Sequence, residues 1–122
     1  MELTRTEAQV MKHLWKLKKA YMKDLLDEYP EPKPKSTTLA TLLKRMIDKG
    51  FVGFHQRGSN REYYPLVRKE QYFSNHLSNM VKDFFNDSDS QFASFFTRES
   101  DMSIQELEDL KAEIEARINK KK

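Results

Sequence analysis

Apolar residues recur at helical spacing in the first two segments of the chain. Thr4 and Glu7 have the spacing of a capping box, and the apolar positions that follow predict a helix ending near Leu17. A second helix is predicted by an apolar face that consists of Met22, Leu25, Leu26 and Tyr29. The prolines at positions 30, 32 and 34 end this helix, because each lacks a backbone donor and disfavours helix in the residue before it.

A third segment predicts a helix with one apolar and one polar face. Ser36 or Thr37 can cap this helix, and Gly50 closes it. Its apolar stripe consists of Leu39, Leu42, Leu43, Met46 and Ile47. At about 100° per residue, the positions between about 140° and 240° from Leu39 form a separate face that is polar throughout. The residues on that face are Thr37, Thr41, Lys44, Arg45 and Asp48.

The hydrophobic period changes after Gly50. The segments FVGFHQ and REYYPL are rich in aromatic and β-branched residues, and the RGSN segment between them has the composition of a turn. This pattern predicts a two-stranded hairpin that packs on the helices, since an isolated hairpin is only marginally stable. Residues 1–68 are therefore expected to form a winged helix-turn-helix domain, and the fold class is mainly α with a small β-hairpin.

Residues 69–122 predict helices only. One helix begins at the start of this region, and capping-box spacings at Ser88 with Gln91 and at Ser103 with Glu106 predict two more. No sheet covers the three apolar stripes, so we expect a second copy of the chain to complete the core, although a helical subdomain packed on the first domain is the alternative. The expected dimerisation residues are Phe73, Leu77, Met80, Phe84, Phe92, Phe95, Leu107, Leu110, Ile114 and Ile118.

The net charge of +3 is distributed unevenly along the chain. Residues 1–68 contain 14 Lys and Arg against 8 Asp and Glu, whereas residues 69–122 contain 8 against 11. This asymmetry favours a polyanionic partner for the first half. The plain alternative is that the bases are simply solvated.

The polar face of the third helix and the tip of the hairpin are the candidate DNA contacts. Thr and Ser are mediocre helix formers, so a face chosen for solubility alone would carry more Glu, Lys and Gln. Hydroxyls suit phosphate oxygens and base edges, and the Thr methyl group suits thymine. The predicted DNA-binding residues are Ser36, Thr37, Thr38, Thr41, Lys44, Arg45, Arg57, Asn60 and Arg61. The alternative is a winged-helix module that binds proteins without sequence-specific DNA binding, in which the threonines are ordinary helix caps.

The residue types do not support catalysis. The chain has no Cys, and its three His and three Gly are scattered rather than grouped into a metal site or a phosphate loop. We therefore expect no enzyme, no cofactor and no metal. No apolar run reaches the length of a signal or membrane segment, so the sequence predicts a cytoplasmic protein without membrane insertion.

Four segments carry a family resemblance in chain order. They read LTRTEAQVMKHLW, TLATLLKRMIDKGFV, REYYPLV and SFFTRESDMSIQELEDL. With them the chain resembles the penicillinase-repressor family of bacterial winged-helix proteins, which includes the β-lactamase and methicillin-resistance repressors. The family pattern falls here on Thr38, Leu39, Ala40, Thr41, Arg45, Lys49 and Gly50. The resemblance implies a dimeric transcriptional repressor that binds dyad-symmetric operators with its N-terminal domain and dimerises through its C-terminal helices.

The resemblance also implies how repression ends. Family members are typically released from DNA when a membrane-bound sensor metalloprotease leads to cleavage within the dimerisation region. The best-known repressors are cut between Asn and Phe, and the corresponding pair in this chain is Phe95 and Phe96, which are the expected cleavage site. The copper-responsive branch of the family has a Cys-rich metal site, which a chain without Cys cannot form.

Overall fold

A computed structural model describes residues 3–122, which form two compact units. The first unit extends to His76, and the second begins at Leu77, within helix α4 (Lys69–Phe84). The sequence-based division between residues 68 and 69 lies near this boundary and stays a prediction.

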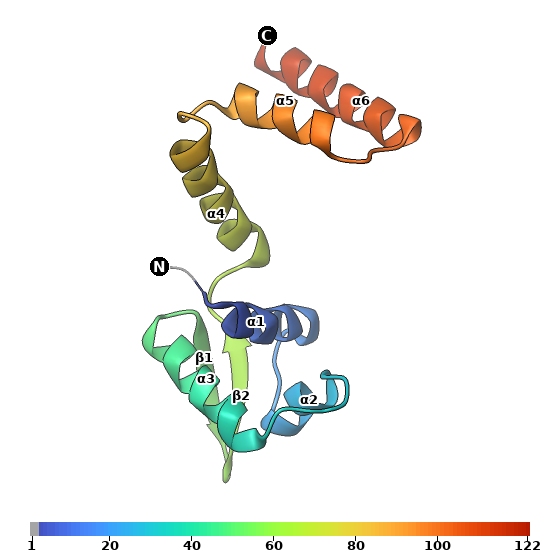
Figure 1. The fold of residues 1–122 in the computed structure, drawn as a ribbon. Helices are drawn as coiled ribbons and strands as arrows, with labels where there is room; N and C mark the ends of the chain where they lie inside the picture. The colour runs from blue at the N-terminus through green and yellow to red at the C-terminus, as the bar shows by residue number, and fades with distance from the viewer. Residues whose placement is uncertain (1–2) are drawn as a thin grey trace. The chain divides into compact units, whose positions relative to one another are not determined.

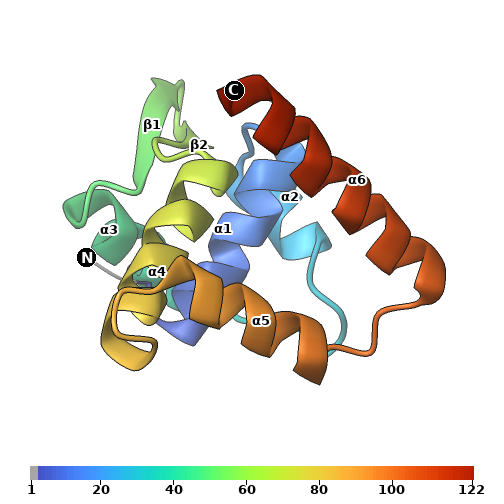
Figure 2. The same ribbon diagram turned by 90° about the horizontal axis from the view of Figure 1, so that it is seen from above.

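The first unit contains three helices and a hairpin, in the predicted order. These elements are α1 (Arg5–Leu17), α2 (Met22–Asp27), α3 (Ser36–Asp48), β1 (Val52–Arg57) and β2 (Asn60–Pro65). Helix α1 packs against α2, α3 and β2 (Figures 1 and 2). The buried apolar residues of the unit are Val10, Met11, Leu14, Ala20, Leu25, Leu39, Leu43, Met46, Phe51, Val52 and Tyr63. The apolar stripes that predicted α1 and α3 therefore meet in one core.

Helix α2 is shorter than its apolar pattern predicts. It ends at Asp27, so the expectation that Tyr29 continues its helical face is wrong. The backbone N–H of Glu28 donates to the carbonyls of Leu25 and Leu26, which closes the helix. Pro30 in turn disfavours helix at the residue before it. Tyr29 still packs against the core from its position after the helix.

The hairpin has the predicted strands and a two-residue turn. Val52 pairs with Pro65 at its base, and Arg57 pairs with Asn60 next to the turn, where Gly58 has a φ of +62°. The structure adds a strand contact that the sequence did not predict. Ala20 and Tyr63 of β2 exchange backbone hydrogen bonds of 2.9 and 2.7 Å. This contact anchors the hairpin to the segment between α1 and α2. A single pair of residues leaves no periodic signal in the sequence.

The N-terminus of α1 is tied to the C-terminus of α3 by a buried carboxylate. The capping box predicted for α1 is confirmed, with Thr4 as N-cap and the backbone N–H of Thr4 donating to Glu7 Oε1 at 2.8 Å. Glu7 has no exposed surface. Its Oε1 also accepts from Lys49 Nζ at 2.7 Å, and its Oε2 lies 3.9 Å from Arg45 Nε.

The environment of Glu7 favours its charged form. Burial on its own raises the pKa of the Glu7 carboxyl, but hydrogen bonds from Lys49 and Thr4 outweigh burial and hold the pKa below its usual value. A carboxyl whose pKa falls on folding stabilises the folded state at neutral pH. That contribution is lost as the pH falls through the folded-state pKa.

The second unit is a set of helices with almost no buried side chains. Besides the end of α4 it contains α5 (Asp89–Glu99) and α6 (Ile104–Lys121). Ser103 with Glu106 forms the complete capping box that its spacing predicts for α6. At α5 the predicted capping box is only half formed, because the Ser88 side chain accepts from the Gln91 N–H but the reciprocal bond of a capping box is not formed. Val81 is the one buried apolar residue from Leu77 onward. Phe85 makes ring contacts with Phe92 and Phe95 at centroid distances of 5.4 and 5.5 Å.

Within residues 3–122, none of the helices combines the length and the apolar character that crossing a membrane requires.

Replacing Lys49 tests the buried carboxylate. Lys49→Met should lower the free energy of unfolding by roughly 3 kcal/mol at pH 7, because Glu7 would stay buried without its hydrogen-bonded cation. The difference from the wild type should shrink as the pH falls, because Glu7 without its cation is protonated at a higher pH than in the wild type, where Lys49 holds the pKa of the carboxyl below its usual value. Urea unfolding at several pH values measures both effects.

The matched control is Lys44→Met, since Lys44 is 79% exposed and lies 3.8 Å from the exposed Asp48. It should change the free energy of unfolding by less than about 0.5 kcal/mol. Equal losses from the two variants at pH 7 would contradict a structural role for the buried pair.

Candidate nucleic-acid interface

Helix α3 separates its apolar and polar residues onto opposite faces. Leu39, Leu43 and Met46 are fully buried, which fixes the rotation of the helix about its axis. The residues that we call the polar face of α3 are all exposed, and they are Ser36, Thr37, Thr38, Thr41, Lys44 and Arg45. Burial of one stripe therefore directs Thr37, Thr41, Lys44 and Arg45 towards solvent, while Ser36 and Thr38 are exposed in the first turn of the helix.

The first turn of α3 has no side-chain cap. The expectation that Ser36 or Thr37 caps the helix is wrong, because both lie inside its first turn and Lys35 occupies the N-cap position. Lys35 has no acceptor atom in its side chain, and no side-chain cap bond is formed. The first backbone N–H groups of a helix have no intrahelical partner, and together with the helix dipole they favour an anion. An exposed, uncapped turn that carries three hydroxyls is therefore suited to a phosphate group.

Internal contacts restrain the remaining groups of this face. The Thr41 hydroxyl donates to the Thr37 carbonyl at 3.0 Å, so outward it offers a methyl group and acceptor lone pairs. Lys44 lies 3.8 Å from Asp48, and both are well exposed, so water and salt screen this pair. Arg45 is half exposed and faces the buried carboxylate of Glu7.

The hairpin directs its predicted contact residues to opposite sides. Cross-strand partners share a face, which places Arg57 with Asn60 on one face and Arg61 on the other. Arg57 Nε lies 3.3 Å from Glu62 Oε1, whereas the Arg61 guanidinium lies 4.2 Å from the centre of the Phe54 ring. The tip of the hairpin and the N-terminus of α3 lie towards the same end of the unit, the lower end in Figure 1.

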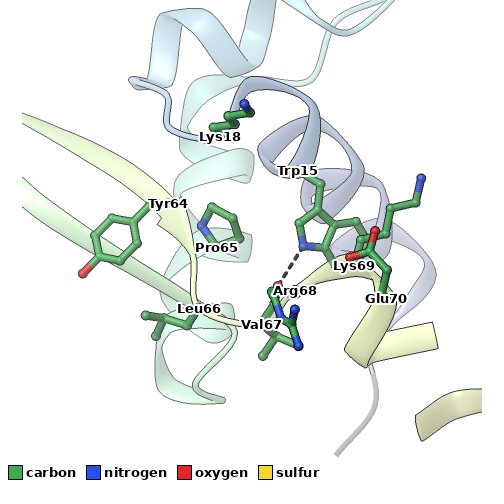
Figure 3. Close-up of a pocket in the computed structure, with 9 residues that line it drawn as sticks. All are labelled: Trp15, Lys18, Tyr64, Pro65, Leu66, Val67, Arg68, Lys69 and Glu70. Atoms are coloured by element: carbon green, nitrogen blue, oxygen red, sulfur yellow. Dashed lines mark hydrogen bonds between the residues drawn. The ribbon is translucent and has the colours of Figure 1, made fainter. Parts of the chain in front are cut away.

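The first unit also has a cavity of about 460 Å³ where α1 meets the segment that leads from β2 into α4 (Figure 3). Its lining residues are Trp15, Lys18, Tyr64, Pro65, Leu66, Val67, Arg68, Lys69 and Glu70. The indole N–H of Trp15 donates to the Val67 carbonyl at 2.8 Å, which holds this segment against α1. None of the predicted DNA-binding residues lines the cavity, so it is separate from the polar face of α3.

Three residues that shape this interface are absent from the DNA-binding residues predicted from the sequence. Lys35 is the N-cap of α3, and the pair of Glu7 and Lys49 connects its last turn to α1. A signal for Glu7 exists in the sequence, because it lies three, four and seven positions before buried apolar residues of α1 and so shares their face. No local signal identifies its partner 42 positions away.

The chain matches a family model along most of its length. Residues 3–116 match the model described as penicillinase repressor. The penicillinase repressor of Bacillus licheniformis is 25% identical over 122 residues, which cover 99% of this chain and 95% of that relative. The methicillin resistance regulatory protein MecI of Staphylococcus aureus (strain N315) is 25% identical over 111 residues, which cover 90% of each chain.

Two solved structures resemble the first part of the chain at 26% identity. The solution structure of the DNA-binding domain of the repressor BlaI aligns with a TM-score of 0.51 and covers 58% of this chain and 88% of that one. The solution structure of monomeric Bacillus licheniformis BlaI in complex with the blaP half-operator aligns with a TM-score of 0.50, covering 59% and 89%. These similarities confirm the predicted winged-helix fold class.

Because α3 lacks a side-chain cap, adding one should stabilise the protein. Lys35 already has the extended backbone of an N-cap residue, with φ −72° and ψ 146°, so a serine there can accept from the first turn without rearrangement. Lys35→Ser should raise the free energy of unfolding by about 1 kcal/mol relative to Lys35→Ala, which removes the same charge without adding an acceptor. Thermal and urea unfolding of the two variants measure the difference. Equal stability would mean that the first turn is not open to a cap.

Proposed function

Because the chain belongs to the penicillinase repressor family, we propose that it is a transcriptional repressor that binds double-stranded operator DNA through α3 and the hairpin. The relatives that match it are named as repressors and regulatory proteins, and the family is not one of enzymes. The observation that carries the proposal is the polar face of α3, which is exposed along the helix and uncapped at its start. The similar BlaI structure in complex with a half-operator supports it.

Helix α3 supplies two kinds of contact in this proposal. Its first turn donates backbone N–H groups and the hydroxyls of Ser36 and Thr37 to a phosphate, which positions the helix on the duplex. Thr38 and Thr41 then lie towards base edges in the major groove, where their methyl groups suit thymine and their oxygens accept from base amino groups. Lys44 and Arg45 supply charge to the flanking phosphates or to a guanine.

The hairpin supplies contacts on both of its faces. A hairpin tip that enters the minor groove has one strand of the duplex on each side. Arg61 on one face and Arg57 with Asn60 on the other would therefore contact different strands. Arg57 would exchange its pairing with Glu62 for a phosphate, and its own side chain is 55% exposed and so within reach of DNA.

We further propose that the chain acts as a homodimer assembled through the second unit. Several apolar side chains there stay at least 40% exposed, which is costly for a monomer in water. The exposed set includes Leu77, Phe84, Phe95, Phe96, Leu107, Ile114 and Ile118. A second copy would cover these stripes and would pair two reading units, as a dyad-symmetric operator requires.

Derepression by proteolysis completes the proposal. A membrane-bound sensor metalloprotease would lead to cleavage near Phe95 and Phe96, whose side chains are 44% and 49% exposed. The bond between them lies inside α5, so the helix must open locally before it fits a protease. Cleavage there would separate α6 from the reading unit. The two half-site contacts would then no longer be linked, and affinity for the full operator would fall.

Selection of random duplex DNA on the full-length protein tests the reading function and the dimer together. The enriched sequences should form a dyad whose half-sites are centred about 10 bp or a multiple apart. Ile114→Lys, which places a charge on the apolar stripe of α6, should give a monomer by sedimentation and should enrich single half-sites. Glu115→Lys is the control, because Glu115 is exposed and polar and its replacement should leave the dyad intact. A folded wild-type protein that enriches no motif would favour the protein-binding module instead.

The two Lys35 variants test how α3 meets phosphate. Both lose one cation, but the serine hydroxyl also occupies an N–H group of the first turn. Lys35→Ser should therefore bind the selected operator roughly fivefold more weakly than Lys35→Ala although it is the more stable protein. Fluorescence anisotropy with labelled duplex measures the ratio. Equal affinities would mean that the first turn of α3 does not contact a phosphate.

A further inference from the structure

The two oxygens of the Glu7 carboxylate have different surroundings. Oε1 accepts from the Thr4 backbone at 2.8 Å and from Lys49 Nζ at 2.7 Å. Oε2 is buried and has no hydrogen-bond partner. It faces Arg45, whose Nε lies 3.9 Å away, which is within ion-pair range but too far for a hydrogen bond.

The cap of α1 does not explain why this residue is charged. A glutamine at the same position can accept the Thr4 N–H equally well, since capping boxes use either residue. In a glutamine, however, an NH2 group without an acceptor would take the buried position where Oε2 now faces Arg45, and an unsatisfied buried donor costs free energy. The charge is therefore directed at the two cations of α3 that it faces, Lys49 and Arg45.

Without that carboxylate, the C-terminal half of α3 would be strongly basic. Lys44, Arg45 and Lys49 lie within two turns, and the other nearby acid is the exposed Asp48. Each cation that is free to neutralise a phosphate strengthens binding to DNA of any sequence. The Glu7 carboxylate is buried although the Arg45 side chain is 55% exposed, so solvent screens their attraction less than it screens the pair of exposed groups formed by Lys44 and Asp48.

We infer that Glu7 is a positioning residue that determines specificity by restraining Arg45 at the edge of the polar face of α3. Held by Glu7, Arg45 contacts DNA only where the operator presents a phosphate or base at the matching position. On unrelated sequences it does not reach a backbone phosphate. The inference rests on the proposed function, since it concerns discrimination by the same helix. It assigns a role in DNA recognition to a residue that cannot itself touch DNA.

The test compares the affinities for the selected operator and for a scrambled duplex over a range of salt concentrations. In Glu7→Gln, affinity for the scrambled duplex should rise, and its log–log salt slope should steepen by up to about 0.9, as one more cation reaches a phosphate. The ratio of operator to scrambled affinity should fall about tenfold. A structural role alone would weaken both affinities together and would leave the slope unchanged.

A double-mutant cycle with Arg45→Gln shows whether Glu7 acts through Arg45. In the Arg45→Gln background, adding Glu7→Gln should leave the affinity ratio unchanged, because the restrained cation is already absent. Glu28→Gln is the matched control. It neutralises a carboxylate that pairs with Lys16 at 2.7 Å, away from α3, so it adds the same net charge and should leave the ratio unchanged.

Several outcomes would overturn the inference. It fails if Glu7→Gln lowers both affinities by the same factor, if Glu28→Gln changes the ratio as much, or if the cycle shows no coupling. Should Glu7→Gln not fold, Arg45→Lys replaces it, because a lysine keeps the charge but lacks Nε. That variant should lose discrimination, and a retained ratio contradicts the inference. A wild-type protein that does not distinguish the two duplexes would instead refute the proposed function.

Discussion

The buried carboxylate of Glu7 is the contact on which the arrangement of the first unit depends. It joins the first turn of α1 to Lys49, the C-cap of α3, and its own carboxylate has no exposed surface while the Lys49 side chain is 26% exposed. Breaking a buried ion pair costs more than a surface pair, because the remaining charge stays out of water. Together with the buried stripe of Leu39, Leu43 and Met46, this contact fixes which side of α3 faces solvent.

The exposed face of α3 lacks the stabilisation that a side-chain cap at its first turn would give. A capping side chain before α3 would stabilise the helix by about 1 kcal/mol, yet Lys35 leaves the first turn open. α1, α5 and α6 each have a side-chain cap at their first turn, so α3 differs from them in this respect. Unsatisfied donors at an exposed helix start are the groups that a phosphate can use.

The second unit has the opposite character, because its helices leave their apolar residues exposed. Val81 is buried there, while Phe84 and Ile104 remain about four-fifths exposed. Helices of this kind gain most of their stability from packing rather than from propensity. The proposed homodimer would cover these apolar stripes with a second copy of the chain and would link two reading units. Dimerisation and folding of this region are then expected to be coupled.

Local patterns in the sequence determined the helices and strands of this protein. Contacts between residues far apart in the chain decided how these elements are joined. The apolar stripes of α1 and α3, the capping boxes at Thr4 and Ser103, and the hairpin are all predictable, because each depends on residues within a few positions of one another. The Ala20 bridge and the Glu7–Lys49 pair are not, because their partners come together only when α1, α3 and the hairpin share one core. The open first turn of α3 likewise depended on which residue became its N-cap.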